Sequence, residues 1–219
     1  MSRGPEAFEP PAVKAPRVRD APRVPEAAPR WRPEVLALVV GAAVALLLLG
    51  SASWLAAGFA VAWWIPVIVI IRSDLDGYII PDLATAAIAG LGLVYVGANA
   101  LAAGPDDLMV GWAVVGALAT GAMAFGLFWL VGRLYQAWSG RDGLGFGDVK
   151  LAGASALWLT PADGVVALEI AAIGALLLAL ASRRSAPVRD VAIPFGAFLA
   201  PAAWLVFVAG PGVRMLLDP

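Results

Sequence analysis

Two short acidic motifs stand out in a chain that otherwise has few reactive groups. The first, SDLDGYIIPD, carries Asp74 and Asp76, and the second, GLGFGDVKL, places Asp148 among glycines. The chain has no Cys and no His, which excludes thiolate nucleophiles, Ser-His pairs and Cys/His zinc sites. Two neighbouring carboxylates can still activate water, because like charges favour one ionised and one protonated group. The ionised group accepts a proton from water while the protonated group hydrogen-bonds a carbonyl oxygen.

The composition places these motifs in a membrane protein. Of 219 residues, 61% are hydrophobic and 14% are charged, whereas a soluble domain is roughly 25% charged. Residues 1–33 hold seven of the fifteen Lys and Arg residues and many prolines, and no apolar signal core. We therefore expect a disordered Pro/Arg-rich tail over 1–33, a transmembrane domain over 34–210 and a short tail over 211–219.

The apolar runs predict an all-α polytopic bundle of about seven segments, within a range of six to eight. Only internally hydrogen-bonded backbone is stable in lipid, so the runs are read as helices. An uncharged stretch from Val35 to Ile71 is nearly twice the length that spans a bilayer core of roughly 30 Å. The segments are expected near 34–50, 54–71, 83–103, 108–132, 148–160, 164–182 and 191–210.

The basic residues predict the direction of these crossings. With a cytoplasmic N-terminus, fourteen of the fifteen Lys and Arg residues lie on the cytoplasmic side, as the positive-inside rule requires. Asp74 then lies at the cytoplasmic end of the second segment. The chain returns to that face two crossings later at Asp148, so the two carboxylates can meet.

Each acid also has an ordinary structural interpretation. Asp148 is a candidate N-cap at a helix start, although the glycines around it are not needed for a cap. Asp106, Asp107 and Asp163 are interpreted as capping or topological residues in outer turns. Glu169 lies within a predicted span but nearer its outer end, and it is assigned a structural role.

Other functions suit the acids less well. DLDG resembles the start of a calcium loop, but Tyr78 occupies the third ligand position and Gly77 comes too early. A metal-dependent lipid-headgroup transferase would need an Ala-Arg pair after Asp76-Gly77, and this chain has none. A transporter would spread polar residues along several spans, and a non-catalytic assembly protein of the same fold remains a further alternative.

The two motifs resemble the signatures of the type IV prepilin peptidases, which are membrane aspartic proteases with a Gly-x-Gly-Asp motif. SDLDGYIIPD at 73–82 and GFGDVKLAGA at 145–154 match in order and spacing, and IPFGAFLAPAAW at 193–204 is similar to a third family segment. The resemblance covers about residues 32–210. It implies that Asp74 and Asp148 are catalytic, with no cofactor and no metal.

The resemblance also implies the substrate and the location. The expected reaction removes the short basic leader of a prepilin or pseudopilin at the cytoplasmic face of a bacterial inner membrane. The apolar substrate helix would lie in the bilayer, and no nucleic acid is expected as a partner. Larger family members carry a Cys-x-x-Cys domain and methylate the new N-terminus, so a chain without Cys is expected to lack that activity.

Four neighbouring residues are assigned supporting roles on the same basis. Asp76 would tune the first acid by like-charge repulsion, and Gly145 and Gly147 would admit the substrate backbone. Lys150 would pair with an acid or with substrate carboxylates, or simply lie at the membrane interface.

Overall fold

The computed structural model describes residues 32–49, 53–104, 106–141, 143–182 and 193–217. Within these ranges all regular structure is helical, which confirms the predicted all-α bundle. The seven helices are α1 Arg32–Leu49, α2 Trp54–Gly77, α3 Asp82–Ala103, α4 Asp107–Ser139, α5 Phe146–Ala156, α6 Pro161–Ser182 and α7 Gly196–Leu217. The predicted tail lies almost wholly outside the described residues.

Polar residues beside the apolar runs cap the helices. Ser53 Oγ accepts a hydrogen bond from the Ala56 N–H at 3.2 Å, which starts α2. Asp106 Oδ1 accepts one from the Leu108 N–H at 3.0 Å and starts α4. The capping interpretation of Asp106 is thereby confirmed.

Several helices differ in extent from the prediction: α4 ends at Ser139 rather than near 132, and α7 continues to Leu217 through most of the predicted tail over 211–219. α2 continues six residues past Ile71 to Gly77, so Asp74 and Asp76 lie in a helix rather than in a loop. α6 begins at Pro161 rather than near 164, because Thr160 and Asp163 form a cap in which the Asp163 N–H donates to Thr160 Oγ1 at 3.2 Å. The extension of α2 therefore contains two acids of the first motif.

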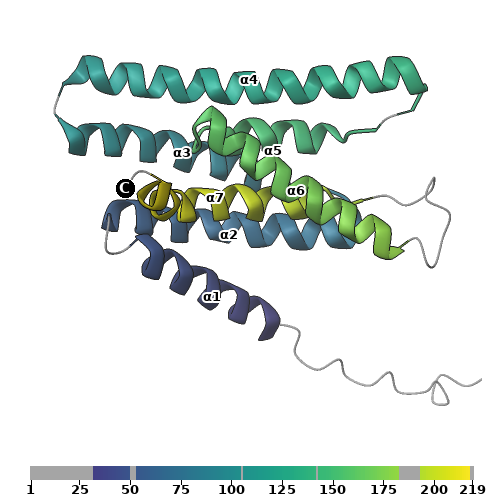
Figure 1. Ribbon diagram of the computed structural model, residues 1–219, viewed down its shortest axis with the longest axis horizontal. Coiled ribbons are helices and arrows are strands. Elements are labelled where there is room, and N and C mark those ends of the chain that lie inside the picture. Colours follow the sequence, from purple (N-terminus) through teal and green to yellow (C-terminus); the bar gives the residue numbers. More distant parts are fainter. Residues whose placement is uncertain (1–31, 50–52, 105, 142, 183–192, 218–219) are drawn as a thin grey trace, which may run out of the picture.

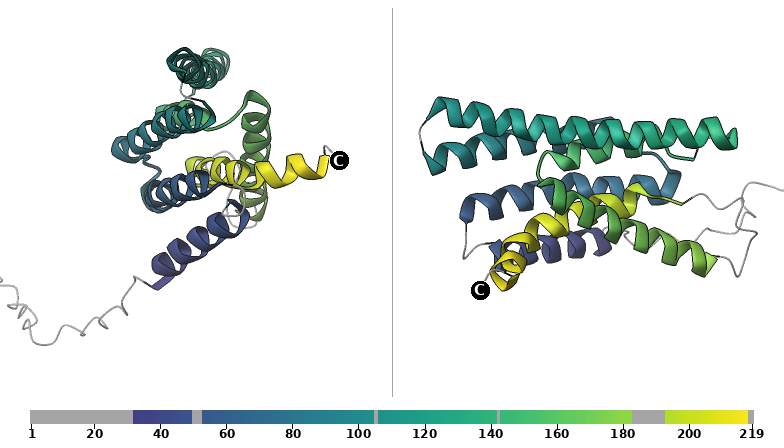
Figure 2. Two further views of the ribbon diagram at one scale, coloured as in Figure 1. Left: turned by 90° about the vertical axis from the view of Figure 1, so that its left-hand side faces the viewer. Right: turned by 45° about the horizontal axis from the view of Figure 1, so that its top comes forward.

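The helix α2 lies at the centre of the bundle, against α1, α3 and α7 (Figure 1). On the other side α4 packs along α3 and α5, and α6 packs on α7. The two views of Figure 2 show α4 as the outermost helix and α6 crossing obliquely beside α7. Gly121 of α4 and Gly153 of α5 allow the close approach, since a Cβ on Gly121 would lie 3.0 Å from the Gly153 carbonyl oxygen.

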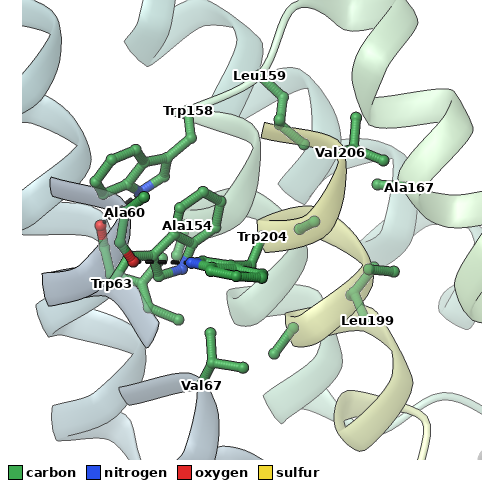
Figure 3. Packing of buried hydrophobic residues seen from close by; sticks show 14 of the residues in the cluster. Ala60, Trp63, Val67, Ala154, Trp158, Leu159, Ala167, Leu199, Trp204 and Val206 are labelled. Atoms are coloured by element: carbon green, nitrogen blue, oxygen red, sulfur yellow. Dashed lines mark hydrogen bonds between the residues drawn. The ribbon is translucent and has the colours of Figure 1, made fainter. Parts of the chain in front are cut away.

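Tryptophans join the helices in the core (Figure 3). The rings of Trp63 and Trp158 stack with centroids 4.3 Å apart, linking α2 to the residues just after α5. Trp204 Nε1 of α7 donates to the Ala60 carbonyl of α2 at 2.8 Å. This bond satisfies the Trp204 indole among apolar neighbours, where an unpaired donor is costly, whereas Trp63 Nε1 is buried with no hydrogen-bond partner among the described residues.

Four of the described helices, α2, α3, α4 and α6, are long and apolar enough to cross a membrane. The 33 residues of α4 correspond to about 50 Å of helix, well beyond a hydrocarbon core of roughly 30 Å. By contrast α5 has only 11 residues. The helix α5, too short to cross a bilayer core, therefore packs beside a much longer one.

Candidate active site

Asp74 is held near the end of α2 and is 4% exposed. Its Oδ2 accepts a hydrogen bond from the Ala197 N–H at 2.7 Å. Ala197 belongs to the first turn of α7, where free N–H groups and the helix dipole favour a negative charge. The start of α7 thus orients the Asp74 carboxylate and stabilises its ionised form.

Asp148 is the third residue of α5, and the N-cap of this helix is Gly145, which makes no side-chain cap bond. The interpretation of Asp148 as an N-cap is therefore wrong. Its Oδ1 is buried and has no hydrogen-bond partner among the described residues. A buried carboxyl oxygen of this kind calls for an explanation, because nearly all such atoms in folded proteins are paired.

Both carboxyl groups line one cavity of about 820 Å³, which we name the aspartate cavity. They are close enough for the charge on Asp74 to act on Asp148. The structure therefore brings together the two acids that the sequence predicted would share one face. The other lining residues are Tyr78, Leu127, Phe128, Val131, Tyr135, Arg141, Gly143, Leu144, Gly145, Leu168, Ala175, Ile193 and Phe195.

Ile80, in the link between α2 and α3, lies against the start of α5, which carries Asp148, and against the start of α7, which binds Asp74. A Cβ built on Gly147 would lie 3.1 Å from Ile80 Cβ, and one built on Gly196 would lie 2.5 Å from Ile80 Cδ1. Both are shorter than ordinary carbon contacts of about 3.5–4.0 Å. Glycine is therefore needed at both positions for α5 and α7 to approach the link between α2 and α3.

Of the remaining predicted site residues, Gly145 lines the cavity, whereas Asp76, Gly147 and Lys150 do not. A Cβ on Gly145 would lie 3.1 Å from Asp148 Oδ2. Lys150 forms an ion pair with Asp82, the first residue of α3. Asp76 is exposed on α2 and does not line the cavity. Glu169 is likewise exposed, on α6.

Several lining residues were not identified from the sequence. Tyr78, Tyr135 and Arg141 add two phenols and a guanidinium to the cavity. Their loop and helix-end positions gave no signal. Gly196 and Ala197 lie in the segment IPFGAFLAPAAW at 193–204 noted above. Its resemblance to a family segment was the one available hint that this part of the chain reaches Asp74.

Fold and site together define a polytopic helical membrane protein with a two-carboxylate site near one end of the bundle. Comparison with known sequences agrees. Residues 59–180 match the model of the type IV leader peptidase family. The chain belongs to this family.

Individual relatives are bacterial proteins named prepilin leader peptidase/N-methyltransferase. The protein from Aeromonas hydrophila is 31% identical over 186 residues, which are 82% of this chain and 58% of the relative. The one from Pseudomonas aeruginosa is 31% identical over 144 residues, 63% of this chain and 44% of the relative. The chain thus spans about half the length of the curated relatives it matches. No solved structure matches it significantly.

Proposed function

We propose that this chain is an aspartic endopeptidase that removes the leader of type IV prepilins or prepilin-like proteins. The observation that carries the proposal is the shared cavity lined by Asp74 and Asp148. Family membership supports it, and so do the peptidase names of the relatives. Water activated between the two carboxyl groups would attack the scissile carbonyl, without any group outside the chain.

The surroundings of the two acids suggest different roles for them. Asp74 accepts the Ala197 N–H and faces the start of α7, so it is the better site for the negative charge. Asp148 has a buried oxygen without a partner and lies beside that charge, so it is the better site for the proton. We assign Asp74 as the general base toward water and Asp148 as the acid that hydrogen-bonds the carbonyl oxygen.

The reaction would take place at the cytoplasmic face. Arg72 and Arg141 lie near the ends of α2 and α4, at the end of the bundle where α5 begins. Basic residues gather on the cytoplasmic side of membrane proteins, which favours this orientation. A basic prepilin leader reaching the membrane from the cytoplasm would then meet the aspartate cavity directly.

The names of the relatives combine a peptidase with an N-methyltransferase. The proposal assigns only the peptidase to these 219 residues, because they contain no Cys to supply the cysteine pairs found in larger family members. Mass spectrometry of a cleaved product separates the two activities, since methylation adds about 14 Da to the new N-terminus. We expect the cleaved, unmethylated mass.

The test is co-expression with a candidate prepilin, following loss of the leader by mass. Asp74→Asn and Asp148→Asn should each abolish cleavage. The matched control is Asp107→Asn, because Asp107 is an exposed acid at the opposite end of α4 and does not line the aspartate cavity. Cleavage retained by either dyad variant, at a level near that of the control, would refute the assignment.

A further inference from the structure

A second, apolar pocket of about 160 Å³ adjoins the aspartate cavity. Leu127 and Phe128 of α4 and Leu168 of α6 line both. Along each of these helices the lining residues of the apolar pocket come first and those of the aspartate cavity follow. The two hollows therefore form one depression between α4 and α6, which we name the α4–α6 groove.

The two walls of the groove have matching lengths. On α4 the lining residues run from Thr120 to Tyr135, and on α6 they run from Pro161 to Ala175. At 1.5 Å per residue both walls are about 21–23 Å long. In Figure 1, α6 slants away from α4 toward the end where α2 finishes, and the hollow beside the acids is the larger one, about 820 Å³ against about 160 Å³.

The floor of the groove is made of small side chains. Ala152, Ser155 and Ala156 of α5 line its narrow part, together with Ala203 of α7. Ser155 Oγ is buried there and has no partner among the described residues. Small residues on a membrane helix permit close packing of another helix, and a buried hydroxyl provides a hydrogen bond across such a contact.

The walls expose large apolar side chains that no described helix covers. Met123 and Leu127 of α4 are 58% and 54% exposed, and Val165 of α6 is 55% exposed. The apolar part leads without interruption to the paired carboxylates. An occupant that matches both parts is a peptide with an apolar helix and a polar segment to be cut at one end of it.

We propose that the α4–α6 groove binds the apolar helix of the substrate and places the bond to be cut in the aspartate cavity. This inference rests on the proposed peptidase function and adds a binding surface to it. A groove of about 21 Å accommodates roughly 14 residues of helix. Affinity for the substrate would then depend on side chains far from the two acids.

Filling the groove tests the proposal by kinetics. Gly164 lines the apolar pocket, and nothing lies within 4 Å of a Cβ built there, so a Leu side chain can start into the groove at this position. Gly126 of α4 is exposed, is equally open and lines neither hollow, so Gly126→Leu is the control. Gly164→Leu should lower kcat/KM for a full-length prepilin at least about tenfold, mainly through KM, and leave the melting temperature unchanged.

Cross-linking tests the same contact without relying on turnover. The chain has no Cys, so a single Cys can be introduced at will. Met123→Cys lies in the groove and is compared with Met109→Cys. Met109 is 67% exposed on α4 and does not line the groove. In the Asp148→Asn background, Met123→Cys should form a disulfide with a single Cys placed in the apolar helix of the prepilin. Met109→Cys should not.

The outcomes separate the two proposals. If the unaltered chain does not cleave the prepilin, the peptidase function is refuted, and the groove proposal with it. Normal cleavage together with an unaffected Gly164→Leu variant, or equal cross-linking from both Cys positions, would overturn the groove alone. Cross-linking of Met123→Cys only to a thiol-bearing lipid probe would assign the groove to lipid and also overturn it.

Discussion

Replacing Gly196 by Ala should reduce activity by crowding Asp74. The new Cβ would lie 2.5 Å from Ile80 Cδ1 and 3.1 Å from Asp74 Oδ2. Ile80 also packs against Gly147, with its Cγ1 and Cδ1 each 3.4 Å from the Cβ position of that residue, so the side chain that meets the new methyl group lies between α5 and α7. Overpacking of this kind costs about 1–3 kcal/mol. A catalytic group displaced by about 1 Å can lose roughly 100-fold in rate, so we expect kcat for prepilin cleavage to fall about 10- to 100-fold.

Truncating Ile80 should restore part of that loss. Ile80→Ala removes the Cγ1 and Cδ1 atoms that meet the new methyl group, while the contact with Asp74 Oδ2 remains. The double variant should therefore show a favourable coupling of about 0.5–3 kcal/mol in a double-mutant cycle. The assay is single-turnover cleavage of purified prepilin in detergent, paired with thermal unfolding of each variant.

The control for this series is Gly90→Ala. Gly90 lies on an exposed face of α3 with nothing within 4 Å of its Cβ position, so the same substitution meets no obstacle. Its activity should equal that of the unaltered chain. Equal activity of Gly196→Ala and Gly90→Ala would refute the proposed clash with Ile80. So would a Gly196→Ala/Ile80→Ala variant that is no more active than Gly196→Ala.

Three further changes probe the scaffold through thermal or denaturant unfolding in detergent. Trp158→Phe should lower the free energy of unfolding by about 1–3 kcal/mol, because it removes the 3.0 Å bond from Trp158 Nε1 to the Ile88 carbonyl; an unchanged value would contradict this. Lys150→Met should cost less than about 1 kcal/mol, since the side chains of Lys150 and Asp82 are 31% and 78% exposed, and a larger loss would show a stronger pair. Tyr78→Gly should raise the free energy of unfolding by about 1 kcal/mol, because Tyr78 caps α2 with a φ of 55°, a left-handed conformation that favours glycine. A decrease would show that the Tyr78 side chain stabilises the fold by more than this backbone conformation costs.

Most of the fold was predictable from the sequence because the bilayer imposes simple lengths and polarity. The apolar runs predicted all seven helices, and counting crossings predicted that Asp74 and Asp148 share one face. Helix ends were less predictable. A charged residue such as Arg72 marks where apolar composition stops, but the backbone hydrogen bonds of α2 continue to Gly77.

One missed helix end did carry a readable signal. The TPAD sequence at 160–163 combines a Thr cap, a Pro at the first helical position and an acid at the third, which is a typical helix start. The packing inside the site carried no such signal. The bond from Ala197 to Asp74 joins residues 123 positions apart. The contacts of Ile80 with Gly147 and Gly196 depend on how closely α5 and α7 approach it.

The stacked Trp63 and Trp158 rings form a contact between the two chain segments that lead to the acids. Trp63 lies eleven residues before Asp74 and Trp158 lies ten residues after Asp148, so each segment is about 15 Å long. A rotation of about 5° between the segments would move their carboxyl ends by roughly 1.3 Å. Substitutions in the deep apolar core can therefore adjust the spacing of the acids, so the rate of a reaction at the membrane surface can be tuned by residues that never meet water.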